Sequence, residues 1–281
     1  MVRTAVILTV YNRKEITLHG LCSLSKAIEY LGEDYTFDIY MTDDGCTDGT
    51  GEAVIQEFPQ VKIIKGDGKL YWSGGMRKAW QAAIDSGAEY DFYLWFNDDA
   101  DLYEDALVTL FKDMKTAGNY AIITGAFCDA YGKTSYGGKT KQREIVSPQG
   151  EIVPIELMNG NLVLVPKKVY DCLGMISVHY QHGFGDYDYA LRAKKDEIPT
   201  FLSSKHVGET DRHDEKIPTP FSLEKGLIQR WRILHHPMNK PATAFRFNLT
   251  HFGMKKAMKG WMRSYLYLFF PKLYYIKHHL C

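Results

Sequence analysis

The stretch Tyr90–Asp105 constrains the fold most, because an apolar run ends in it abruptly at a group of carboxylates. Phe92 to Phe96 are all apolar or aromatic, and Asp98, Asp99 and Asp101 follow closely. A short apolar run bounded by polar residues is typical of a strand that is buried on both faces of a sheet. Ligands of open α/β sheets bind at the carboxyl ends of such strands.

The three clustered carboxylates have two interpretations. They repel one another, and a hard divalent cation with oxygen ligands would relieve that repulsion. This favours a Mg²⁺ or Mn²⁺ site that also holds a phosphate group. The alternative is an acidic loop in which Asp101 caps a helix over 103–117.

Further apolar and β-branched runs alternate with helical periodicity along the first half of the chain. This order predicts an α/β fold with a mostly parallel sheet, right-handed crossovers and flanking helices. The predicted strands are Thr4–Val10, Thr36–Thr42, Val61–Lys65, Phe92–Phe96, Tyr120–Phe127 and Leu162–Val165, and the predicted helices include 14–31, 76–86, 103–117 and one that opens at residues 182–188. Two irregular segments, 128–156 and 203–220, are expected as a hairpin or flap and as a polar loop.

Two predicted strands end in segments that suit nucleotide binding. The second strand ends in the sequence DDGCTDGT over residues 43–50, in which an ordinary turn explains Asp48 but not the pair Asp43 and Asp44. A glycine-bearing loop over residues 66–77 opens a helix, and free amides there, with Gly74 and Arg77, can hold a diphosphate. A glycine-rich loop is weak support for phosphate binding when taken alone.

The charge of the chain is divided unevenly. The net charge is zero, but 11 of the 34 Lys and Arg residues lie in 225–281, where there is no Asp or Glu. The first 224 residues therefore carry 23 basic groups against all 34 acidic groups. This split predicts that the tail faces an anionic partner.

The composition of the tail also suggests where the protein works. Its aromatic and basic residues favour a helix at a membrane interface, but packing of the aromatics on the main domain explains them equally well. Five dispersed cysteines fit reduced thiols, and no secretory signal precedes the first strand. We expect a cytoplasmic protein that binds no nucleic acid. The first interpretation of the tail would make it peripheral on the inner face of the cell membrane, and the second would not.

Four motifs in one order resemble the family 2 glycosyltransferases, which have the GT-A fold. They are the strand end Thr9-Val10-Tyr11-Asn12-Arg13, the turn Asp43-Asp44-Gly45-Cys46-Thr47-Asp48, the group Asn97-Asp98-Asp99 and the helix start Gly185-Asp186-Tyr187-Asp188 with Arg192. The resemblance covers about residues 3 to 215. It departs from the family pattern at Cys46 (serine), Asn97 (the first aspartate of D-x-D) and Gly185 (glutamate).

The resemblance implies a catalytic GT-A domain over 1–220 and a helical extension over 221–281. It implies an inverting transferase that uses a nucleoside-diphosphate sugar, a saccharide or lipid-linked saccharide acceptor, and Mg²⁺ or Mn²⁺. Asp186 would be the catalytic base. The donor-binding residues would be Thr9, Tyr11, Asn12, Arg13, Asp43, Asp44, Gly74, Arg77, Asn97, Asp98 and Gly160. The candidate metal ligands are Asp99, Asp101 and His206, and it stays open whether Asp99 binds alone or together with Asp98, Asp101 or His206.

Two other functions fit parts of the pattern. A sugar-phosphate nucleotidyltransferase would need a glycine-rich loop after the first strand, and Tyr11-Asn12-Arg13 does not provide one. A non-catalytic nucleotide-sugar-binding protein with a decayed site is disfavoured by the joint presence of Asp44, Asp99 and Asp186. Surface polysaccharide or glycoconjugate assembly in bacteria is expected from the resemblance alone.

Overall fold

The computed structural model of the chain describes residues 1–210, 219–237 and 239–279. The chain divides into two compact units. The sheet unit comprises Met1–Val178 and Gly185–Arg212, and the helical unit comprises His179–Phe184 and His213–Cys281. The division predicted from the sequence assigned residues 179–184 to the first domain.

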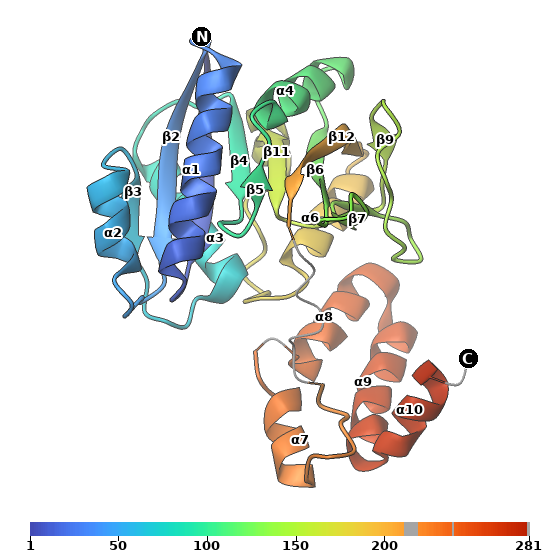
Figure 1. Cartoon of the computed structure of the whole chain (residues 1–281). Helices are drawn as coiled ribbons and strands as arrows, with labels where there is room; N and C mark the ends of the chain where they lie inside the picture. Colours follow the sequence, from blue (N-terminus) through green and yellow to red (C-terminus); the bar gives the residue numbers. More distant parts are fainter. Residues whose placement is uncertain (211–218, 238, 280–281) are drawn as a thin grey trace. The chain divides into compact units, whose positions relative to one another are not determined.

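The sheet unit is built on one large mixed sheet with the strand order β3-β2-β1-β4-β11-β6-β12-β5 (Figure 1). β7 pairs with β6, and β9 pairs with β12, outside this order of strands. β8 and β10 form a separate two-stranded sheet. The strands are β1 (Val2–Val10), β2 (Tyr35–Asp43), β3 (Lys62–Lys65), β4 (Phe92–Phe96), β5 (Asp101–Leu102), β6 (Ile122–Cys128), β7 (Thr134–Tyr136), β8 (Gly138–Lys139), β9 (Val153–Pro154), β10 (Leu157–Met158), β11 (Leu162–Pro166) and β12 (Thr200–Glu209).

The pairing of these strands brings most of their carboxyl ends to one edge. β1 is parallel to β2 and β4, β2 is parallel to β3, and β6 is parallel to β12. β11 runs antiparallel to both β4 and β6. The strands β1, β2, β3, β4, β6 and β12 therefore share one direction, which confirms the predicted mostly parallel sheet.

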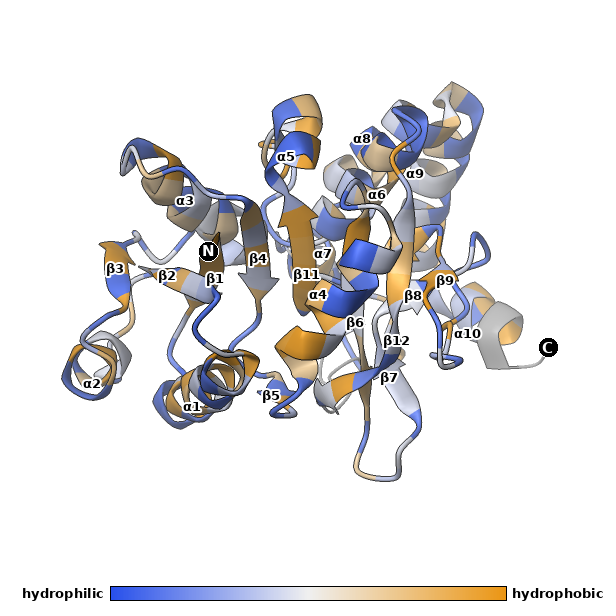
Figure 2. Ribbon diagram, turned by 90° about the horizontal axis from the view of Figure 1, so that it is seen from above, coloured by the Kyte–Doolittle hydropathy of each residue, from blue (hydrophilic) through white to orange (hydrophobic). Residues whose placement is uncertain are grey.

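Helices cover both faces of the sheet (Figure 2). Alternate residues of β1 serve the two cores, because successive side chains of a strand point to opposite faces. Val6 and Leu8 belong to the core under α1, whereas Ala5 and Ile7 belong to the core under α3. The helices α1 (Lys14–Leu31), α2 (Thr50–Glu57) and α4 (Ala106–Thr116) contribute to the first core, and α3 (Tyr71–Asp85), α5 (Lys167–Leu173) and α6 (Gly185–Lys195) contribute to the second.

The helical unit consists of short helices joined by tight turns. Its helices are α7 (Leu227–Leu234), α8 (Pro241–Phe252), α9 (Met254–Phe269) and α10 (Pro271–His279). Proline opens α8 and α10, where its missing N–H has no partner to lose. Phe184 stacks on Phe247 of α8, with ring centroids 4.6 Å apart, which explains why residues 179–184 belong to this unit. Among the described helices, none combines the length and the apolar character needed to cross a membrane.

Three sequence-based predictions of local structure were wrong. Asp101 does not cap α4: it lies in β5, and α4 begins at Ala106 after Asp105. α3 begins at Tyr71 rather than residue 76, so the helix includes most of the glycine-bearing loop.

The third error concerns residues 203–220, which were expected to form a polar loop. The described part of this stretch continues β12, which pairs in parallel with β6. Its register shifts between Leu202 and His206 and again before Gly208. These irregularities break the alternation of apolar and polar residues that would have indicated a strand. Residues 211–218 lie outside the described part of the chain.

Gly20 of α1 fixes how closely this helix approaches β4. A Cβ atom at this position would lie 2.2 Å from the backbone oxygen of Asp98. We predict that Gly20→Ala lowers the free energy of unfolding by about 1–3 kcal/mol, although alanine favours a helix, because the clash is with backbone.

Denaturant unfolding measures this effect. Gly183→Ala is the matched control, since nothing lies within 4 Å of a Cβ there. An unchanged midpoint for Gly20→Ala would show that α1 can move away from β4 without cost.

Candidate functional site

The ends of β1, β2 and β4 bring the predicted donor-binding residues to one edge of the sheet. Val10 pairs with Asp43, the last residue of β2, and Ile7 pairs with Trp95 near the end of β4. The segments that follow these strands therefore start beside one another. They contain Tyr11, Asn12 and Arg13 after β1, Asp44 after β2, and Asn97, Asp98 and Asp99 after β4.

Asp98 is a buried carboxylate held by α1. Its Oδ1 lies 2.5 Å from Nη2 of Arg13, and its Oδ2 accepts a 2.6 Å hydrogen bond from Thr17. Burial raises the pKa of Asp98 to about 6, against the opposing effects of Arg13 and Thr17. Asp98 is thus a structural anchor between β4 and α1, and its charge is balanced within the protein.

Asp99 is the more accessible carboxylate of the pair. Its side chain is 18% exposed, and its Oδ2 lies 3.2 Å from Nη1 of Arg13. Its backbone oxygen accepts a 3.1 Å hydrogen bond from the Thr210 hydroxyl, which connects the end of β4 to the end of β12. The backbone of Asp99 is therefore tied to the end of β12, and its side chain retains partial exposure.

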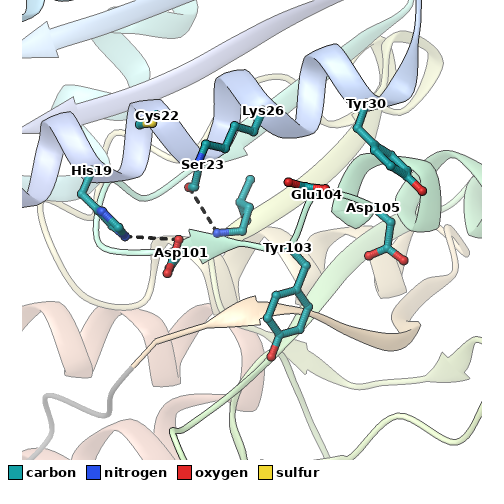
Figure 3. Close-up of a pocket in the computed structure, with 10 residues that line it drawn as sticks. His19, Cys22, Ser23, Lys26, Tyr30, Asp101, Tyr103, Glu104 and Asp105 are labelled. Carbon is teal, nitrogen blue, oxygen red and sulfur yellow. Dashed lines mark hydrogen bonds and ion pairs between the residues drawn. The ribbon is translucent and has the colours of Figure 1, made fainter.

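Asp101 turns to a different surface of the sheet unit. Its Oδ1 lies 3.2 Å from Nε2 of His19 on α1, and the two side chains face each other in Figure 3. They line a cavity of about 480 Å³. The lining comes from α1 and from the segment around β5: His19, Cys22, Ser23, Lys26, Tyr30, Asp101, Leu102, Tyr103, Glu104 and Asp105. Asp98, Asp99 and Asp186 are not part of this lining.

His206 is also placed apart from the β4 carboxylates. Its Nε2 lies 3.0 Å from the Thr134 hydroxyl of β7, and it pairs with Ala126 in the sheet. Burial lowers its pKa. Within the described residues, no group of three or more His, Cys, Asp or Glu side chains is arranged to hold a metal ion. The expected ligand set Asp99, Asp101 and His206 is therefore not assembled in this structure.

Asp43 and Asp44 have separate partners. Asp43 accepts hydrogen bonds from Lys65 (2.7 Å) and from the Cys46 backbone (2.8 Å). Burial opposes ionisation of Asp43, but these hydrogen bonds outweigh it and its pKa is lowered.

Asp44 instead binds the loop that leads into α3. Its two oxygens accept backbone N–H groups of Gly68, Leu70 and Tyr71 at 2.9–3.1 Å. Tyr71 has a left-handed backbone with φ 54°, which costs energy for a side chain of this size. The hydrogen bonds to Asp44 hold this strained turn in place.

The segment after β1 is tied to the turn after β2. Asn12, whose φ is 48°, accepts a 2.7 Å hydrogen bond from the Thr47 backbone. Asp48 accepts the N–H of Lys14 at 3.0 Å, at the start of α1. Tyr11 is exposed between these contacts. Hydrogen bonds thus join the segment after β1 to the turn after β2.

The first turn of α3 packs directly on these strand ends. A Cβ at Gly75 would lie 2.0 Å from the Thr9 hydroxyl, and the Gly75 carbonyl accepts a 2.8 Å hydrogen bond from Thr42. Arg77 donates to the Ser177 carbonyl at 2.7 Å, and burial lowers its pKa. Gly74 lies in the same turn.

Trp72 connects α3 to β4 and to the turn before β11. Its Nε1 donates a 2.7 Å hydrogen bond to Oδ1 of Asn97. A Cβ at Gly160 would lie 2.4 Å from the Trp72 ring, and the Asn97 N–H donates to the Asn161 carbonyl at 2.8 Å. Asn97 and Gly160, both predicted as donor-binding residues, therefore lie on either side of Trp72.

Asp186 stands at the first turn of α6, next to this cluster. Hydrogen bonds from the backbone of Tyr187, at 2.8 Å, and of Gly160 reach its carboxylate. Burial raises its pKa to about 6, although these hydrogen bonds and the charge of Lys139 oppose the rise. Such a group is largely ionised at neutral pH and can accept a proton.

Asp188 has a different role. It is buried, and it accepts a 2.9 Å hydrogen bond from Nε of Arg192, one helical turn later. Arg192 also donates to the carbonyls of Leu173 and Met175. This pair holds α6 against the segment after α5 and distinguishes Asp188 from Asp186.

Sequence reasoning did not identify Thr17, Trp72 and Lys139. Thr17 is four residues after Arg13, the N-cap residue of α1, and both side chains contact Asp98. Trp72 lies within the glycine-bearing loop, and no local pattern distinguishes it from the other residues of that loop. Lys139 is brought to Asp186 by the small pair β8–β10, which the sequence does not indicate.

Comparisons with known proteins agree with this arrangement. The profile of glycosyl transferase family 2 matches residues 5–171. No match was found among curated protein sequences.

Solved structures show the same fold. A mannosyltransferase, PcManGT from Pyrobaculum calidifontis, in complex with GDP-Man and Mn²⁺, is similar with a TM-score of 0.54 at 14% identity, over 94% of this chain and 73% of that one. Residues 1–349 of S. aureus TarS in complex with UDP-GlcNAc give a TM-score of 0.56 at 13% identity, over 94% of this chain and 79% of that one. A longer TarS structure is covered to 44%.

The contrast between Asp186 and Asp188 predicts stability changes of opposite sign. Because the pKa of Asp186 is raised in the folded state, ionisation of this carboxyl lowers the free energy of unfolding. The loss grows as pH rises from about 4 to about 6. We predict that Asp186→Asn stabilises the protein at pH 8, by up to about 3 kcal/mol, and that the gain disappears below pH about 4.

Asp188→Asn should instead destabilise the protein by about 2–3 kcal/mol at pH 8, because it leaves Arg192 without its carboxylate. Thermal unfolding of both variants across this pH range checks the two signs. A loss of stability for Asp186→Asn at pH 8 would contradict the burial cost assigned to Asp186.

Proposed function

Because the chain belongs to glycosyl transferase family 2, we propose that it transfers a sugar from a nucleoside-diphosphate donor to an acceptor hydroxyl with inversion of configuration. One observation carries this proposal beyond family membership. Asp186 is a partly buried carboxylate, and among the described contacts it forms no ion pair with a basic side chain. Contacts through Gly160 and Trp72 connect it to the ends of β1, β2 and β4. A proton acceptor and a candidate donor surface are thus joined in one rigid framework.

Asp186 is the catalytic base in this proposal. It would take the proton of the acceptor hydroxyl as that oxygen attacks the anomeric carbon from the face opposite the leaving diphosphate. A pKa of about 6 leaves it ionised at pH 7 and still basic enough to accept a proton. Lys139 keeps the pKa from rising further, so it tunes the base without being in direct contact with the reacting atoms.

The donor would bind across the ends of β1 and β2 and the first turn of α3. Thr9, Tyr11, Asn12 and Arg13 would line the nucleoside side together with Asp43 and Asp44. The hydrogen bonds from the 68–71 backbone to Asp44 support a role of Asp44 in shaping this surface. Its contact with the nucleobase is a further part of the proposal. Amides near Gly74 and the Arg77 guanidinium would balance the charge of the diphosphate.

A divalent cation fits the carboxylate at the end of β4. Mg²⁺ is usually bound by one or two carboxylates together with substrate phosphates and water, rather than by a cage of protein ligands. Asp99 offers such a carboxylate, since its side chain is partly exposed and its backbone is held by Thr210. When bound, the cation would neutralise charge that develops on the leaving diphosphate. Arg13 contacts both Asp98 and Asp99, but the Asp98 side chain is completely buried whereas that of Asp99 is 18% exposed, so Asp99 is the ligand we propose.

The biological setting is a further part of the proposal. We propose that the acceptor is a saccharide or a lipid-linked saccharide, in the assembly of a surface polysaccharide or glycoconjugate at the cytoplasmic side of the membrane. The similar structures hold GDP-Man in one protein and UDP-GlcNAc in another, which supports a nucleotide-sugar donor without selecting a base or a sugar.

The metal proposal predicts that nucleotide affinity depends on the cation through Asp99. A thermal-shift screen of nucleotide sugars with and without Mn²⁺ first identifies a donor. We then expect Mn²⁺ to raise the affinity for that nucleotide in the wild-type chain, and to have little effect in Asp99→Asn.

Calorimetry with and without a chelator measures these affinities. Asp101→Asn is the matched control and should retain the full effect of Mn²⁺, since Asp101 faces His19. Equal affinity of the wild-type protein in excess chelator would rule out a cation at this site.

The base proposal predicts a separation of binding from turnover. Asp186→Asn should bind the donor normally but lose at least ~100-fold in kcat, the usual effect of removing a general base. In the wild-type protein, kcat/KM should fall about tenfold per pH unit below pH about 6, where Asp186 becomes protonated. Lys139→Met should shift this decrease to higher pH, because the charge of Lys139 lowers the pKa of Asp186.

Initial rates of donor turnover across pH, with donor affinities from calorimetry, test these statements. Asp188→Asn is the matched variant, and its activity per folded molecule should stay within about tenfold of wild type. If Asp188→Asn were the inactive variant and Asp186→Asn the active one, the base would be the other carboxylate.

A further inference from the structure

α9 of the helical unit has a row of exposed apolar side chains. Each of these residues has 41–60% of its surface exposed. Their spacing of three and four residues places them along one side of the helix. The row, called the apolar stripe below, consists of Met254, Met258, Trp261, Met262, Leu266 and Phe269.

Basic residues lie directly beside the apolar stripe. At about 100° per residue, Lys255, Lys259 and Arg263 form a second row along one edge of the stripe, between the stripe and the buried Tyr267. The packed face is marked by Ala257 and Leu268, which are completely buried. α9 therefore has three faces: one packed within its own unit, one exposed and apolar, and one exposed and basic.

Aromatic contacts extend the apolar stripe onto α7. The Tyr265 ring lies 4.7 Å from the Trp261 ring and 6.1 Å from the Trp231 ring, measured between centroids. Trp231 is 46% exposed, and Ile228 of the same helix is 71% exposed. Exposed side chains also continue past the end of α9, at Phe270, Leu273 and Ile276. The exposed apolar surface therefore covers parts of three helices.

The charge of this region limits what can cover the stripe. Residues 225–281 contain 11 Lys and Arg and no Asp or Glu. If the same surface of a second copy packed against the stripe, two equally basic regions would meet, and like charges would oppose that symmetric contact. An anionic surface is complementary instead.

We propose that the apolar stripe and its basic row bind the surface of an anionic lipid bilayer, with α9 lying along the headgroup region. Tryptophan and phenylalanine beside lysine and arginine are the composition of such interfacial helices. This inference concerns a surface of the helical unit and does not depend on the proposed reaction.

Vesicle flotation of the full chain tests the proposal. The vesicles are equimolar phosphatidylglycerol and phosphatidylcholine, compared with phosphatidylcholine alone. We expect the protein to float with the anionic vesicles at low salt, to float less at high salt, and to remain unbound with the neutral vesicles.

Two variants separate the charge from the apolar contacts. Reversal of the basic row (Lys255→Glu, Lys259→Glu and Arg263→Glu) should weaken binding by on the order of 100-fold, because each basic group near an anionic surface contributes roughly a factor of five. Polar replacement of part of the stripe (Met262→Ser, Leu266→Ser and Phe269→Ser) should abolish the binding that survives at physiological salt. These side chains are exposed, so both variants should fold, and thermal unfolding checks this.

The control carries the same charge change in the sheet unit. Lys112→Glu, Lys115→Glu and Lys168→Glu alter exposed lysines and should leave flotation nearly unchanged. An equal loss in this control would show that net charge alone drives binding and would overturn the assignment to α9. Absence of flotation with anionic vesicles at low salt, or self-association that the stripe variant abolishes, would overturn it as well.

Discussion

A buried carboxylate at the end of β4 is the interaction on which the candidate site depends. Asp98 is held by Arg13 and Thr17, and the backbone of α1 approaches it at Gly20. A charge buried in this way is tolerated only when it is paired, and removal of its partner leaves a cost of several kcal/mol. The pair thus determines where α1 begins, where the segment after β1 runs, and how Asp99 is presented beside it.

A second framework connects this end of the sheet to α6. Trp72 donates to Asn97 and packs on Gly160, while the Gly160 backbone reaches Asp186. Each contact is an ordinary hydrogen bond or a close approach at a glycine, but together they join the start of α3, the end of β4 and the start of α6. The chemistry therefore depends on residues that a catalytic motif does not contain.

Much of the fold and part of the site could be predicted from the sequence. Continuous apolar runs predicted β1, β2, β4 and β11, because a strand that is buried on both faces has apolar residues at successive positions. β12 was missed because its irregular register hides the strand pattern. Asp101 and His206 were grouped with Asp99 on spacing and resemblance, whereas β5 turns Asp101 toward His19 and β12 brings His206 to Thr134. Side-chain direction across an edge strand or a bulge is set by tertiary pairing, which no local pattern contains.

The configuration of the released sugar tests the central claim most directly. Once a donor is identified, its slow hydrolysis by the protein can be followed by proton NMR before the free sugar equilibrates. Attack from the face opposite the diphosphate, assisted by Asp186, predicts that the sugar first appears with the anomeric configuration opposite to that of the donor. A product that first appears with the donor's own configuration would contradict the account.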